Sequence, residues 1–99
     1  MIVVNAVIES TPEDIAALRE AIGKMETASR AESGCLDYTF SVEVSNPAAI
    51  RITEKWESVE ILKAHFATPH MAEFQAAMGG HPPKSMQVTF YEAEEIQPL

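Results

Sequence analysis

Residues 54–71 read EKWESVEILKAHFATPHM and join the end of a predicted strand to the start of a predicted helix. In the strand over residues 49–57, alternation places Ile50, Ile52, Glu54 and Trp56 on one face. Glu54 therefore stands in a phase otherwise held by large apolar groups. A carboxylate buried there loses hydration at a cost of several kcal/mol, unless it finds a hydrogen-bonding partner or takes up a proton. Glu54 is thus a candidate functional residue.

The helix that follows has a polar residue in its apolar face. Ser58 can cap this helix, and His65 falls at the centre of an apolar arc that consists of Ile61, His65, Leu62 and Phe66. Thr68 and Pro69 then break the helix and start a second capped segment. One face of that segment carries His70, Met71, Phe74 and Met78. We expect the two segments to aim at one space from different angles.

The rest of the chain alternates strands and helices. A first strand is predicted over residues 2–9, apolar in both phases except at Asn5, and a helix follows from Pro12 to about Glu32. A second strand over residues 35–44 has Tyr38 in its apolar phase and Cys35 in the other. A turn at Asn46 and Pro47 comes next, and a last strand is predicted over residues 86–91. The order βαββαβ predicts an α+β, ferredoxin-like fold, with both helices on one face of a four-stranded sheet.

Composition excludes several classes of function. The 99 residues predict a single domain over residues 1–99. Fifteen acidic and seven basic side chains give a net charge of −8, which disfavours nucleic acid and anionic membranes as partners. Cys35 is the only cysteine, and there is no secretory signal or apolar run of the roughly 18 residues that a membrane span needs. We therefore expect a cytoplasmic protein that binds neither nucleic acid nor membranes.

The predicted layers also indicate a partner and a pocket. Helices cover only one side of such a sheet, and the first strand is apolar on both sides, so a second copy should cover the bare side and form a homodimer. A chain this short has little interior to spare, so a ligand space would be lined by core residues. We expect that space between helices and sheet, lined by Glu54, Trp56 and His65.

The expected pocket carries a base. A carboxylate held against an imidazole raises its basicity, so Glu54 and His65 could remove a proton from a phenol or an activated C–H group. The alternative is that His65 is a hydrogen-bonded core residue, that Trp56 is only a core aromatic side chain, and that Asn5 only bridges to backbone. No metal is expected, because His65 and His70 lie about 140° apart on a regular helix with Pro69 between them, and no HExxH motif is present.

Three segments carry a family resemblance. EKWES at residues 54–58 and AHFATPHM at residues 64–71 resemble the phrases EQWES and AHLxTPHM of the antibiotic biosynthesis monooxygenase superfamily, especially its small bacterial quinol monooxygenase-like members. ESGCLDY at residues 32–38 resembles the family's segment entering the second strand. The resemblance implies a dimeric α+β barrel protein that oxidises quinols or polycyclic phenols with O₂, without metal or flavin. The site residues that it implies are His65 or Glu54 as base, with Asn5, Tyr38, Trp56, Phe66, His70 and Phe74 around the substrate.

Relatives within the superfamily leave other functions open. A haem-degrading branch shares an asparagine on the first strand, but at its iron-ligating position this chain has Gln75 or Ala76, which argues against haem. A branch of isomerases acting on a phosphorylated quorum-sensing sugar also has a histidine followed by TPH. Its anionic substrate calls for a cationic pocket, for which this chain offers only histidines. A dimeric ligand-binding module without turnover is the third possibility.

Overall fold

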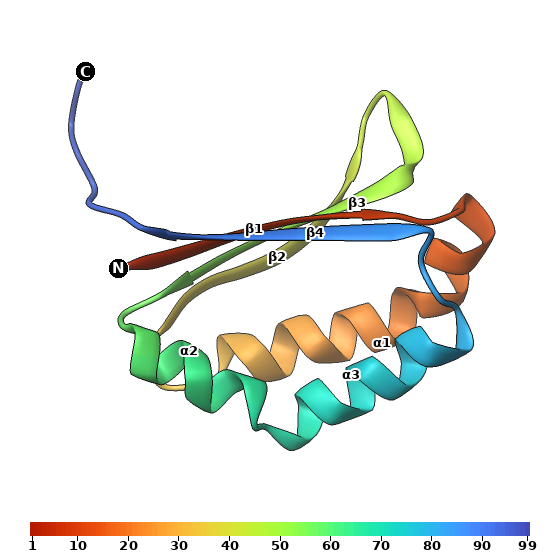
Figure 1. Ribbon diagram of the computed structural model, residues 1–99, viewed down its shortest axis with the longest axis horizontal. Coiled ribbons are helices and arrows are strands. Elements are labelled where there is room, and N and C mark those ends of the chain that lie inside the picture. Colours follow the sequence, from red (N-terminus) through yellow and green to blue (C-terminus); the bar gives the residue numbers. More distant parts are fainter.

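Four strands and three helices make up the computed structural model, which describes residues 1–99. The elements are β1 (Ile2–Glu9), α1 (Pro12–Arg30), β2 (Cys35–Glu43), β3 (Asn46–Trp56), α2 (Val59–Phe66), α3 (Pro69–Gly80) and β4 (Ser85–Glu92). The strands are ordered β2-β3-β1-β4, with every neighbouring pair antiparallel. All three helices lie on one side of the sheet (Figure 1). The predicted ferredoxin-like α+β fold is confirmed, with its second helix divided into α2 and α3.

Alternation along β1 separates the two faces of the sheet. The side chains in the phase of Val4 face the helices and are buried: Ile2, Val4, Ala6 and Ile8. Val3 and Val7 lie on the open face and are only half-buried, and Asn5 between them is exposed. Asn5 pairs with Thr53 and Thr89, whereas Val4 pairs with Glu54. Because successive residues of a strand point to opposite faces, Asn5 cannot share a pocket with Glu54 in this chain. The structure therefore does not bring Asn5 together with Glu54, Trp56 and His65.

The turn after α1 begins earlier than predicted. Thr11 caps the helix by accepting from the Asp14 backbone N–H at 3.1 Å, with Pro12 in the first turn, as the sequence indicates. The helix ends at Arg30 instead of about Glu32, because the chain must reverse to enter β2. Gly34 makes that reversal with φ +83°, a conformation that favours glycine. Glu32 therefore lies in the turn between α1 and β2.

The β2–β3 hairpin differs from the prediction at both ends. The turn falls at Val44 and Ser45, and Asn46 already pairs with Glu43 at the start of β3. At the other end, a register shift at Leu36 places Cys35 opposite Trp56 and Tyr38 opposite Glu54. The extra residue moves Cys35 to the helix side, where it packs against the core, instead of the face away from Tyr38.

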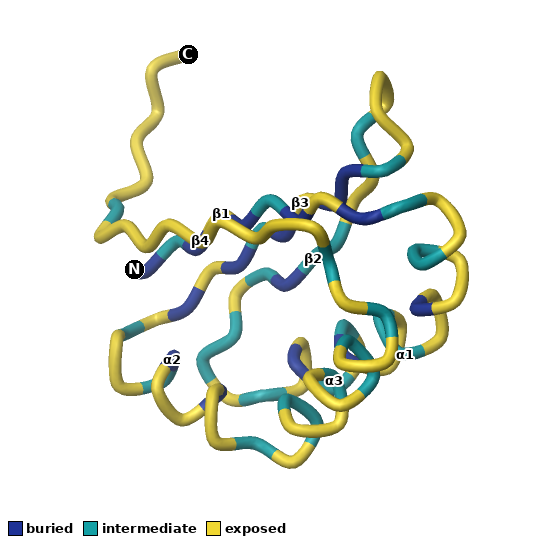
Figure 2. The backbone as a smooth tube through the Cα atoms, turned by 45° about the vertical axis from the view of Figure 1, so that its right-hand side comes forward, coloured by how far each residue is buried: buried dark blue, intermediate teal, exposed yellow.

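Helix cover is uneven across the sheet. In β4, Met86, Val88 and Phe90 pair with buried residues of β1 and so belong to the helix-facing phase. They are nevertheless 57, 40 and 53% exposed, and the whole strand is drawn as exposed in Figure 2. The edge beside β4 is therefore an apolar surface open to solvent.

None of the helices combines the length and apolar character needed to span a membrane.

Candidate active site

His65 lies at the centre of the layer between α2 and the sheet. Its side chain is fully buried. The imidazole packs on the indole of Trp56, with ring centroids 4.5 Å apart, and against the Tyr38 ring at 5.4 Å. Tyr38 and Trp56 meet edge to face at 6.2 Å. The structure thus brings together three of the residues that the sequence analysis selected, from β2, β3 and α2.

A carboxylate that the sequence analysis missed binds this histidine. Glu32 Oε2 lies 2.6 Å from His65 Nδ1 and 2.8 Å from His70 Nε2. Because a carboxylate only accepts hydrogen bonds, each of these ring nitrogens carries the proton that it donates. We call Glu32, His65 and His70 the His–Glu–His cluster. Its three donor atoms all lie within 4.8 Å of one another, which makes it the place where this chain could hold a metal ion.

The break at Pro69 creates this cluster. The angle of about 140° between His65 and His70 holds for one continuous helix. Thr68 instead caps a new helix, accepting from the Met71 backbone N–H at 3.3 Å, and α3 leaves in another direction. The two imidazoles then converge on one oxygen. The geometric argument that kept them apart was wrong.

The other nitrogen of His65 has no partner. Nε2 is buried and makes no hydrogen bond within the protein. In the neutral ring, with the proton on Nδ1, this buried atom carries a lone pair that accepts no hydrogen bond. An unsatisfied buried polar group costs about 1–3 kcal/mol and is uncommon in folded proteins. A ligand hydroxyl donating to Nε2 would remove that cost.

Glu54 makes a different hydrogen bond from the one expected. Its Oε1 accepts from Trp56 Nε1 at 2.9 Å, and the side chain is buried. The two residues are neighbours on one face of β3, so the indole reaches the carboxylate, while His65 Nδ1 turns toward Glu32. The predicted Glu54–His65 hydrogen bond is therefore absent. Burial raises the pKa of Glu54, against the opposing effects of the indole hydrogen bond and of nearby His65, and the charge of Glu32 raises it further.

The remaining predicted residues lie around this centre. Burial, followed by the charge of Glu54, raises the pKa of the Tyr38 phenol, so Tyr38 stays a neutral hydroxyl. Phe66 is 47% exposed and stands between His65, at 5.8 Å between centroids, and Phe90, at 6.4 Å. Together with Met86 and Val88 of β4, Phe66 and Phe90 form what we call the entrance surface.

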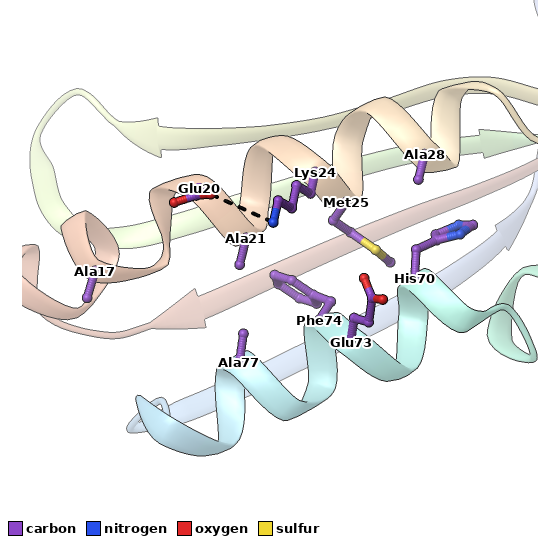
Figure 3. Close-up of a pocket in the computed structure, with 10 residues that line it drawn as sticks. All are labelled: Ala17, Glu20, Ala21, Lys24, Met25, Ala28, His70, Glu73, Phe74 and Ala77. Carbon is purple, nitrogen blue, oxygen red and sulfur yellow. Dashed lines mark ion pairs between the residues drawn. The ribbon is translucent and has the colours of Figure 1, made fainter.

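His70 and Phe74 line a separate space. A groove of about 610 Å³ runs between α1 and α3, with His70 at one end and Phe74 beside Met25 at its floor (Figure 3). Phe74 also packs on Phe40 of β2, with centroids 5.5 Å apart. His70 thus connects the groove to the His–Glu–His cluster, while Trp56 and Tyr38 lie behind it in the core.

Known proteins share both the sequence pattern and the fold. Residues 1–77 match the model of the antibiotic biosynthesis monooxygenase family. An uncharacterized Synechocystis protein is 30% identical over 71 residues, which are 72% of this chain, and this chain spans about half (48%) of that relative's length. A proposed antibiotic biosynthesis monooxygenase from Deinococcus radiodurans has 28% identity and a TM-score of 0.90, covering 100% of this chain and 98% of that one. A Mycobacterium tuberculosis protein has 25% identity and a TM-score of 0.84 over 96% of each chain. The chain belongs to the antibiotic biosynthesis monooxygenase family.

Proposed function

We propose that this protein is a cofactor-independent monooxygenase that oxidises quinols or related polycyclic phenols with O₂, using His65 as its base. The observation that carries the proposal is the buried, unpartnered Nε2 of His65. Its opposite nitrogen is fixed by Glu32, so the ring is held in one tautomer with its basic nitrogen free. This is the arrangement that a general base needs, with a carboxylate that stabilises the imidazolium once the proton has been taken.

Deprotonation is the step that the protein must supply. A phenolate or enolate is electron-rich enough to pass electrons to O₂, so the substrate itself is the reductant. In the overall reaction, one oxygen atom stays on the substrate and the other leaves as water. Glu54 lies in the same buried layer, where Trp56 Nε1 holds its Oε1 and burial raises its pKa, so its other oxygen can bond a substrate hydroxyl. The Trp56 indole contacts both groups, because it bonds Glu54 and packs on His65.

The entrance surface gives the substrate a route to His65. An aromatic ring placed on Phe90 and Val88 would bury exposed apolar area, at about 25 cal/mol per Å². Within that surface, Phe66 contacts both Phe90 and the His65 imidazole, so rotation of the Phe66 ring would open a path toward Nε2. The surrounding aromatic side chains exclude water, which protects the anion from reprotonation.

We further propose that two copies associate through the open face of the sheet. Val3 and Val7 on this face are only half-buried, and Tyr91, which pairs with Val3, is 50% exposed. A second sheet packed on this face would cover all three. Sedimentation equilibrium should give a dimer, and Val7→Lys should shift it toward monomer. A wild-type monomer at micromolar concentration would refute this part.

Oxygen consumption with a panel of quinols tests the function. Metal-free, flavin-free protein should consume O₂ above the autoxidation background, and His65→Gln should lower kcat by at least about 100-fold. His81→Ala is the matched control, because His81 bonds Asp14 at the surface, far from this site in the fold. Activity that survives loss of both His65 and Glu54 would refute the mechanism. Turnover of a phosphorylated ketone without O₂ uptake would identify an isomerase instead, and tight binding without turnover a ligand-binding module.

A further inference from the structure

The His–Glu–His cluster has a donor set that suits a divalent transition metal. Two imidazole nitrogens and one carboxylate oxygen are the ligands of many zinc and iron sites that keep a position open for another molecule. The three atoms already converge: Glu32 Oε2 lies 2.6 Å from His65 Nδ1 and 2.8 Å from His70 Nε2. The ligands come from the α1–β2 turn, α2 and α3.

Small movements would convert hydrogen bonding into coordination. A tetrahedral ion bound at about 2.0–2.2 Å from each ligand requires donor atoms roughly 3.3–3.6 Å apart. The two oxygen–nitrogen distances therefore need to lengthen by roughly 0.5–1 Å. His65 Nδ1 and His70 Nε2, at most 4.8 Å apart, must approach each other. His70 can provide that movement, because its side chain is 21% exposed whereas that of His65 is fully buried.

The groove between α1 and α3 gives an ion access to the cluster. His70 stands at the end of the groove (Figure 3). Glu32, whose Oε2 lies 2.8 Å from His70 Nε2, is 15% exposed. In the groove wall, Glu20 is paired with Lys24 at 3.7 Å, whereas the carboxylate of Glu73 can attract a cation (Figure 3). The open coordination positions would face this groove, away from the core aromatic side chains.

We propose that Glu32, His65 and His70 form a binding site for one divalent cation of the zinc and cobalt class. Coordination takes the lone pair of His65 Nδ1, so the proton of the neutral ring moves to Nε2. If His65 is the base of the proposed reaction, the metal-bound state and the base-competent state exclude each other. Binding itself does not depend on that reaction.

Calorimetric titration of metal-free protein with Zn²⁺, and optical titration with Co²⁺, test the site. Wild type should bind one ion per chain with a visible Co²⁺ absorption band. His70→Gln and Glu32→Gln should each weaken binding by at least about tenfold, since even groups behind a ligand contribute that much. Cys35→Ser and His81→Ala should leave the affinity unchanged and thereby exclude binding by the free thiol or by the surface histidine.

Wild-type protein supplies a second measurement that needs no variant. Long-range ¹H–¹⁵N spectra should show His65 protonated at Nδ1 without metal and at Nε2 with Zn²⁺. Absence of binding, equal affinity in wild type and His70→Gln, or Zn²⁺ binding that leaves both ring spectra unchanged would each overturn the proposal. A loss of O₂ uptake in His65→Gln would not bear on it, so the two proposals can fail separately.

Discussion

Replacing Glu32 with alanine should lower the free energy of unfolding by about 2–4 kcal/mol, although Glu32 lies in a turn. The change removes the acceptor of two hydrogen bonds, of 2.6 Å from His65 and 2.8 Å from His70. The fully buried Nδ1–H of His65 is then left unpaired, which lowers the free energy of unfolding by about 1–3 kcal/mol. His70 is partly exposed and can bond to water instead, so the loss of its hydrogen bond to Glu32 costs only about 1 kcal/mol.

Urea unfolding measured by tryptophan fluorescence gives this free energy, because Trp56 is the only tryptophan and packs on His65. His81→Ala is the control: it removes a contact of 3.0 Å with Asp14, between side chains 40% and 34% exposed, and should cost less than about 1 kcal/mol. If Glu32→Ala costs no more than His81→Ala with unchanged m-values, Glu32 does not hold the buried histidine, and the reasoning about the site is refuted.

Two further predictions concern Glu54 and the glycines. The pKa of Glu54 is raised above its ordinary 4.5, so the folded protein holds more protons than the unfolded chain between the two values, and the free energy of unfolding falls as pH rises through that window. Urea titrations at several pH values should show a shallower fall in Glu54→Gln; identical slopes would contradict the assignment. Gly34→Ala should destabilise by at least about 1–2 kcal/mol, because φ is +83° and the new Cβ would clash with Ile61 Cδ1. Gly23→Ala, in open space within α1, should instead stabilise by about 0.5–1 kcal/mol; the same sign for both glycines would refute this.

The fold could be predicted because its signals are local and periodic. Alternation in β1 and β3, the cap at Thr11 and the break at Pro69 each act within a few residues, so they are visible in the sequence. The shift at Leu36 is not, because a bulge depends on how β2 and β3 align and leaves no mark in the alternation of one strand. Alternation alone therefore placed Cys35 on the wrong face.

The site could be predicted only in part, because its central bond joins residues 33 positions apart. Burial of His65 and Trp56 follows from their apolar phases. The partner of His65 does not, since Glu32 stands in a turn where no periodicity indicates its direction. The sequence predicts that His65 pairs with Glu54, because both are expected to be buried. In the structure Glu54 instead accepts a hydrogen bond from Trp56 on the same strand. Trp56 is only two residues from Glu54 in the sequence, and its hydrogen bond to Glu54 leaves His65 Nε2 without a partner. The proposed chemistry depends on that unpartnered nitrogen.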